Sequence, residues 1–259
     1  MPPDAMLALR SLAFNITFYA NLVVWLVICL PTMLLPRRAL MAVARGWARS
    51  SLWLLRVIAG TRLEVRGLAN IPQGGCLVAC KHQSMWETFA LVPFFSDPTF
   101  ILKRELMFIP FFGWYLWKAD MVPVNRRGGA RAMVRMTEKA AEEARDGRQI
   151  IIFPEGTRRP PGAEPAYKYG IAHLYGRLGV PCLPVALNSG LYWPRRRFIR
   201  RPGTIVVEFL PPIPAGLPRD SLVPALVEAI EPVARRLHAD GLAEIGGTIQ
   251  PAPERAEAP

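Results

Sequence analysis

From Ser11 to Pro36 the chain carries no charged residue. The stretch LAFNITFYANLVVWLVICL within this run extends about 28 Å as a helix, close to the thickness of a bilayer's hydrocarbon core. The charged segment before it is short and no A-x-A cleavage site follows it, so a membrane-associated helix is favoured over a cleaved signal peptide. Asn15, Thr17 and Asn21 make the run only moderately apolar. Both a spanning helix and a shallow insertion are therefore open.

Arginines are distributed unevenly around this run. Arg10 precedes it, and the residues that follow are Arg37, Arg38, Arg45, Arg49 and Arg56. The positive-inside rule then predicts that the bulk of the protein lies on the cytoplasmic face of the cell membrane. The last four of these arginines share one side of a helical wheel, which favours an amphipathic helix at the membrane surface. A core-packed helix with a solvated arginine stripe is the alternative.

The overall composition narrows the class of partner. The formal net charge of +12 indicates an anionic partner, while the 51% hydrophobic content is high for a soluble nucleic-acid binder. We therefore expect contact with anionic membrane lipids and no binding of nucleic acid. The four cysteines match neither a disulfide framework nor a zinc-site spacing, so we expect buried thiols and no bound metal. They are Cys29, Cys76, Cys80 and Cys182.

After residue 60 the sequence alternates between short apolar strands and helical segments. The predicted strands are 61–67, 76–80, 99–103, 121–124, 149–153, 182–187 and 204–210, and the predicted helices begin at Ser84 and span 128–146, 169–179 and 219–238. This alternation predicts an α/β domain with a mixed, largely parallel sheet flanked by helices. The predicted domains are N-terminal membrane-anchoring helices at 1–59, the α/β domain at 60–245 and a disordered tail at 246–259.

Polar and basic residues follow four of the predicted strands. His82 follows CLVAC, Lys103 and Arg104 follow TFIL, Arg126 and Arg127 follow MVPV, and PEGTRR follows QIIIF. Ligands bind outside the carboxyl ends of the strands in open α/β sheets, so these groups are expected to share one edge. Gly156 allows backbone N–H groups to approach an anion, and Arg158 offers a planar fork for phosphate.

The pair His82 and Glu87 in KHQSMWETFAL has two interpretations. Ser84 followed three residues later by Glu87 has the form of a capping box, in which the glutamate bonds to the helix start. Residues five apart in a helix do not face each other, so a His82–Glu87 contact needs His82 to lie in the turn before the helix. Convergence of His82 with the basic loops favours a catalytic pair, although the capping role stays open.

Four segments resemble, in the same order, the motif blocks of the glycerophosphate/1-acylglycerol-3-phosphate acyltransferases. They are HQSMWE, KRELMFIPFFGW, FPEGTRR and LPVALNSG. The similarity covers about residues 60–210, with Glu87 in place of the family's usual aspartate. The resemblance implies that His82 is a general base oriented by Glu87, that Lys103, Arg126, Glu155, Gly156, Thr157 and Arg158 bind the acceptor and its phosphate, and that Pro184 belongs to the acyl side. It implies no cofactor.

The implied reaction moves an acyl chain from acyl-CoA or acyl carrier protein to a lysophospholipid, with phosphatidate as the product when the acceptor is 1-acylglycerol-3-phosphate. Acylation of another lysolipid, such as a lyso-ornithine lipid, and a non-catalytic anionic-lipid binder are the alternatives. The apolar segment FIPFFGWYLW, residues 108–117, lines an acyl tunnel, dips into the membrane or is plain core. The loop RRRFIRR, residues 195–201, docks on anionic lipid or acidic carrier protein, or is merely solvated.

Overall fold

The structure, a computed structural model, describes residues 3–125 and 128–246. Seven strands within these residues form a single sheet. They are β1 (Thr61–Arg66), β2 (Cys76–Cys80), β3 (Pro98–Lys103), β4 (Val122–Val124), β5 (Gln149–Ile152), β6 (Cys182–Leu187) and β7 (Gly203–Phe209).

The strand order across the sheet is β1-β7-β6-β2-β5-β3-β4. Neighbouring strands are parallel except β6 and β7, so β1 and β7 run opposite to the rest. The prediction of a mixed, largely parallel sheet is confirmed. Because β2, β3, β4 and β5 are parallel, the segments that follow them leave the sheet at the same edge.

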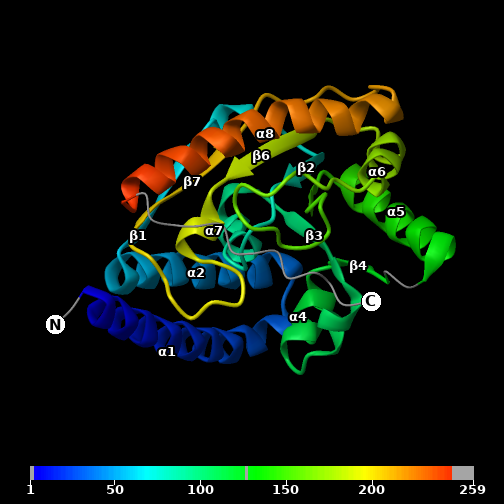
Figure 1. Ribbon diagram of the computed structural model, residues 1–259. Coiled ribbons are helices and arrows are strands. Elements are labelled where there is room, and N and C mark those ends of the chain that lie inside the picture. The colour runs from blue at the N-terminus through cyan, green and yellow to red at the C-terminus, as the bar shows by residue number, and fades with distance from the viewer. Residues whose placement is uncertain (1–2, 126–127, 247–259) are drawn as a thin grey trace.

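Helices cover both faces of this sheet (Figure 1). α5 (Gly129–Arg145), α6 (Gly170–Leu178) and α8 (Arg219–Glu244) cover one face, and α2 (Arg37–Leu54) lies between the other face and α1 (Pro3–Cys29). The remaining helices are shorter: α3 (Glu87–Ala90), α4 (Phe112–Lys118), α7 (Ser189–Tyr192), the 3-10 turns Leu30–Leu34, Leu68–Asn70, Val92–Phe94 and Arg104–Phe108, and a π turn at Leu55–Ala59.

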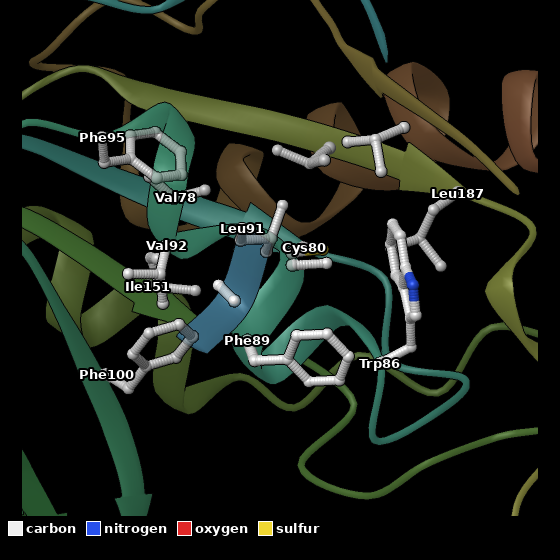
Figure 2. Close-up of a cluster of buried hydrophobic side chains, with 14 of the residues drawn as sticks. Val78, Cys80, Trp86, Phe89, Leu91, Val92, Phe95, Phe100, Ile151 and Leu187 are labelled. Carbon is white, nitrogen blue, oxygen red and sulfur yellow. The ribbon is translucent and has the colours of Figure 1, made fainter. Parts of the chain in front are cut away.

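Side chains along each strand point alternately to the two faces of the sheet, and this divides the core into two layers. Val78 and Cys80 of β2 pack in the layer that faces α1 and α2, whereas Leu77 and Ala79 pack in the layer beneath α5, α6 and α8. Successive strand residues point to opposite faces, and all of β2 is buried, as expected for a strand covered on both sides. Figure 2 shows the first layer, in which Val78, Cys80 and Phe89 are among the buried side chains drawn. The four cysteines are free and buried, as expected for buried thiols.

α1 packs along the body of the protein. Phe14 and Phe18 are buried and contact the ring of Trp193, while Asn21 donates to the Oγ atoms of Ser50 and Ser51 in α2 at 3.0 and 3.1 Å. A row of apolar side chains is exposed on the outer side of α1 and on the turn after it. The row consists of Leu12, Ile16, Tyr19, Val23, Val27 and Leu34. By length and composition the segment Asp4–Leu34 is long and apolar enough to cross a membrane.

α2 differs from the favoured prediction of a surface helix. Leu40, Met41 and Ala48 are buried in the core, and Arg45 donates to the backbone oxygen of Phe95 at 3.2 Å. Arg38, Arg49 and Arg56 are exposed. The alternative, a core-packed helix with solvated arginines, describes α2 better because its apolar side is covered by the sheet layer and by α1.

Residues 108–117 are not plain core. Phe108 and Trp117 are each 70% exposed and Trp114 is 52% exposed. The hydroxyl of Tyr115 in α4 donates to the backbone oxygen of Leu26 in α1 at 2.7 Å, which fastens this aromatic segment to α1. The exposed aromatics therefore extend the apolar surface of the N-terminal helices.

Arg148 is fully buried at the start of β5. Its guanidinium lies 2.5 Å from the carboxylate of Glu143 and donates to the backbone oxygens of Pro98 and Ala119. A buried charge is tolerated only when it is paired and hydrogen-bonded, and these contacts provide both. Arg148 thus joins the starts of β3 and β5 to the end of α4.

Candidate active site

His82 lies two residues beyond the end of β2. Its backbone oxygen accepts the N–H of Arg159 at 2.8 Å, which ties the histidine to the segment after β5. Its imidazole stacks on Phe153, with ring centroids 4.0 Å apart and planes 16° apart. The side chain keeps 15% exposure. Strand β2, the neighbouring β5 and the loop after it therefore fix both the backbone and the ring of His82.

Glu87 is completely buried and its carboxylate accepts four hydrogen bonds. Oε1 lies 2.9 Å from Nδ1 of His82 and accepts the backbone N–H groups of Gln83 and Ser84, each at 2.7 Å. Oε2 accepts the hydroxyl of Ser189 at 2.8 Å. The two interpretations of the sequence are therefore not exclusive, because the same oxygen bonds to the backbone of Ser84 and to the imidazole.

The predicted helix start at Ser84 is wrong. α3 begins at Glu87, and residues 84–86 form a turn in which Ser84 Oγ accepts the N–H of Trp86 at 3.1 Å. The Glu87 side chain points back along this turn because the N–H groups of Gln83 and Ser84 have no helical acceptor there. That backward orientation brings Glu87 to His82 although the two are five residues apart.

The tautomer of His82 follows from this contact. With Oε1 of Glu87 ionised, only a protonated Nδ1 makes a favourable hydrogen bond, and Nε2 is left as the nitrogen that can accept a proton. The carboxylate would also stabilise the imidazolium that forms when Nε2 takes a proton. The arrangement is that of a base and its orienting acid.

The loop after β5 holds Gly156, Thr157 and Arg158 beside this pair. Gly156 adopts φ +67°, a left-handed conformation that favours glycine, and its N–H bonds to the oxygen of Phe153 at 2.9 Å. Thr157 is exposed and Arg158 is half-buried. Burial lowers the pKa of Arg158, the charge of Arg195 lowers it further, and the carboxylate of Glu87 acts in the opposite direction. Arg158 therefore lies within electrostatic reach of the His82–Glu87 pair.

Glu155 points into the protein. Its side chain is buried and its carboxylate lies 3.2 Å from the ammonium of Lys81, which also lies 2.7 Å from Glu231 of α8. The hydroxyl of Tyr167 donates to the same Glu231 oxygen at 2.7 Å, and burial raises the pKa of that phenol. Glu155 thus fastens the loop after β5 to β2 and α8.

The remaining predicted site residues are more scattered. Lys103 is exposed at the end of β3, on the edge where His82 and the loop after β5 also lie. Pro184 is buried within β6, opposite Ala79 of β2. Arg126 lies outside the described residues.

Sequence reasoning missed three residues of this region. Ser189 binds Glu87, and Lys81 and Glu231 form the buried ion pair behind the loop. A usable signal existed for Ser189, which stands in the matched segment LPVALNSG, and for Lys81, which directly precedes His82. Glu231 lies in a helix with no motif around it.

Comparisons with known proteins identify relatives of this chain. The family model described as Acyltransferase matches residues 62–188. A 1-acyl-sn-glycerol-3-phosphate acyltransferase of Pseudomonas aeruginosa is 40% identical over 202 residues, which cover 77% of this chain and 79% of the relative. The alpha form from Mus musculus is 31% identical over 192 residues, covering 71% of this chain and 67% of the relative.

A solved structure has the same fold. The crystal structure of the 1-acyl-sn-glycerophosphate (LPA) acyltransferase PlsC from Thermotoga maritima aligns with a TM-score of 0.72 at 24% identity, covering 94% of this chain and 99% of that one. The chain thus belongs to the acyltransferase family that includes these 1-acyl-sn-glycerol-3-phosphate acyltransferases.

Proposed function

We propose that this protein is a membrane-bound 1-acylglycerol-3-phosphate O-acyltransferase. It transfers a fatty acyl chain from an acyl thioester to the sn-2 hydroxyl of 1-acylglycerol-3-phosphate and so forms phosphatidate. Relatives with this activity in their names support the substrate class. The observation that carries the chemistry is the 2.9 Å contact between Nδ1 of His82 and the buried carboxylate of Glu87.

His82 acts as the general base. Its Nε2 removes the proton of the sn-2 hydroxyl while that oxygen attacks the carbonyl carbon of the thioester. When the tetrahedral intermediate collapses, the C–S bond breaks and the imidazolium returns the proton to the leaving thiolate. Glu87 holds the Nδ1–H tautomer and stabilises the imidazolium between these steps. The acyl group passes directly to the acceptor, without an acyl-enzyme.

Arg158 is the proposed main contact for the acceptor's phosphate, because its guanidinium can donate two parallel hydrogen bonds to phosphate oxygens. Lys103 and Arg126 are proposed as further cations, while Gly156 and Thr157 offer backbone and hydroxyl contacts. Glu155 contributes by position, since its ion pair with Lys81 supports this loop from inside. Pro184 contributes to the acyl side through the packing of β6.

The apolar surface of α1 and the exposed aromatics of residues 108–117 are the proposed membrane contact. Polar side chains on the inner side of α1 bond to the body of the protein, as Asn21 does to α2 and Asn15 to the backbone oxygen of Phe198. A helix held in this way favours shallow insertion over a span that leaves the domain. Residues 1–59 then form the membrane-anchoring unit of the α/β domain, on the cytoplasmic face.

Acyl transfer by membranes that contain the protein tests this proposal. Wild type and His82→Ala would be compared with lysophosphatidate and with an uncharged monoacylglycerol as acceptors, each with acyl-CoA and acyl carrier protein donors. We expect histidine-dependent transfer to lysophosphatidate. Transfer only to the uncharged acceptor would show that the protein acylates a lipid without a phosphate. Transfer to neither would refute the proposed acceptor and leave two alternatives, acylation of another lysolipid and non-catalytic binding of anionic lipid.

A further inference from the structure

The basic segment Arg195–Arg197 contacts the site loop directly. Nη1 of Arg195 donates to the backbone oxygen of Arg158 at 2.9 Å. The N–H of the same peptide unit, that of Arg159, donates to the backbone oxygen of His82 at 2.8 Å. Since the oxygen and nitrogen of one peptide unit are about 2.3 Å apart, Nη1 of Arg195 lies at most about 8 Å from the backbone oxygen of His82.

Three arginine side chains bring positive charge together at this place. None of Arg158, Arg195 and Arg196 forms an ion pair within the described parts of the chain, and Arg195 and Arg196 both lower the pKa of Arg158 by their charge. Glu87, the acidic group that acts on Arg158, already accepts four hydrogen bonds. Like charges brought together at a partly open site favour the binding of an anion.

The loop that carries these arginines is held in place. Arg200 is buried, and its guanidinium lies 4.6 Å from the ring of Trp193 and donates to Asn15 of α1 at 3.0 Å. It also donates to the backbone oxygens of Arg197, Phe198 and Ile199. Arg195 is therefore presented from a fixed loop, which reduces the entropy lost when a ligand binds.

We propose that Arg195, supported by Arg196, completes the binding site for the acceptor's phosphate together with Arg158. This inference rests on the proposed function and names a residue outside the matched motif segments. A guanidinium has five N–H donors, so Arg195 can keep its bond to Arg158 and still donate to a phosphate. The phosphorus of the acceptor lies at most about 5 Å from the sn-2 oxygen, a distance that fits a cation so near His82.

Steady-state kinetics of four matched variants tests the proposal. Arg195→Gln should raise the KM for lysophosphatidate about 10-fold with little change in kcat, the effect of losing one charge-assisted hydrogen bond. Arg196→Gln should cause a smaller rise. Arg195→Lys keeps the charge without the planar fork and should fall between wild type and Arg195→Gln. Arg197→Gln removes an exposed charge from the same segment and should match wild type.

Three results would overturn the inference. An equal KM rise in Arg197→Gln would indicate that the effect comes from general surface charge. A rise in the KM for the thioester donor, with the KM for lysophosphatidate unchanged, would assign Arg195 and Arg196 to donor binding. A fall in kcat with KM unchanged would make Arg195 only a support for the Arg158–Arg159 peptide unit.

Binding of sn-glycerol 3-phosphate separates this inference from the proposed function, since it needs no turnover. The Kd for sn-glycerol 3-phosphate, measured by calorimetry on the full-length protein in detergent, should be higher in Arg195→Gln than in Arg197→Gln. Equal Kd values in the two variants would refute the phosphate contact even if transfer occurs. Absence of transfer by wild type, with the Kd difference present, would refute the proposed function and leave the phosphate site.

Discussion

Replacing Glu87 by glutamine removes a charge while keeping nearly every contact. The amide oxygen can occupy the place of Oε1 and accept from His82, Gln83 and Ser84. The amide NH2 then occupies the place of Oε2, where the hydroxyl of Ser189 can turn to accept from it. The variant should therefore fold like wild type, with a melting temperature within about 4 °C, equivalent to about 1 kcal/mol for a chain of this size.

The catalytic loss comes from the missing charge. A carboxylate and an imidazolium whose charges lie about 4 Å apart attract by about 4 kcal/mol at an effective dielectric constant of about 20. Losing this attraction when the imidazolium forms lowers kcat by about 10³-fold. Glu87→Asp restores the charge on a side chain one methylene shorter, so it should exceed Glu87→Gln by at least about 10-fold while remaining below wild type.

The assay measures kcat for lysophosphatidate with acyl-CoA in vesicles, beside thermal unfolding followed by circular dichroism. A Glu87→Gln enzyme with kcat within about threefold of wild type and an unchanged melting temperature would show that the charge of Glu87 does not stabilise the imidazolium of His82. It would reduce Glu87 to the cap of the turn before α3.

Three further perturbations test other parts of the structure. Ser189→Ala removes one of the four donors to Glu87 and should lower kcat by about 3- to 10-fold through the orientation of His82, with the KM for lysophosphatidate unchanged; a rise in KM alone would contradict this role. Arg148→Ala leaves Glu143 without its closest cation and should lower the free energy of unfolding by about 3–5 kcal/mol, seen as a fall in melting temperature of about 10 °C; an unchanged melting temperature would show that the pair is dispensable. Burial raises the pKa of Cys76 to about 12 and also raises the pKa values of Cys29, Cys80 and Cys182, so all four thiols stay protonated at pH 8. They should therefore resist alkylation by iodoacetamide, measured by mass spectrometry, until the protein is unfolded. Rapid alkylation of the folded protein would disprove their burial.

Local patterns predicted the sheet and the edge of the sheet at which several candidate site residues lie. Short apolar runs marked the strands, and the polar residues after them identified the edge where His82 and Arg158 lie. Local pattern also suggested both contacts of Glu87, with His82 and with the backbone of Ser84, although it presented them as alternatives. A single oxygen that accepts three N–H groups is a matter of side-chain direction, which spacing along the chain does not encode.

The contacts that sequence reasoning missed join distant segments. Glu87 and Ser189 are 102 positions apart, and Lys81 and Glu231 are 150 positions apart. Neither pair has a local signature, because the topology of the sheet and α8 brings them together. The same holds for α2: a helical wheel identified its arginine side correctly but did not reveal that its apolar side packs between α1 and the sheet layer.

The turnover of a His82→Asn enzyme tests most directly whether His82 is the general base. Asparagine can place its amide nitrogen near the position of Nδ1 and keep a hydrogen bond to Glu87, but it has no counterpart of Nε2. With lysophosphatidate and acyl-CoA, we expect a kcat lower by about 10²- to 10⁴-fold, the loss typical of removing a general base, in a protein that remains folded and membrane-bound. Turnover close to that of wild type would contradict the assignment of His82 as the base.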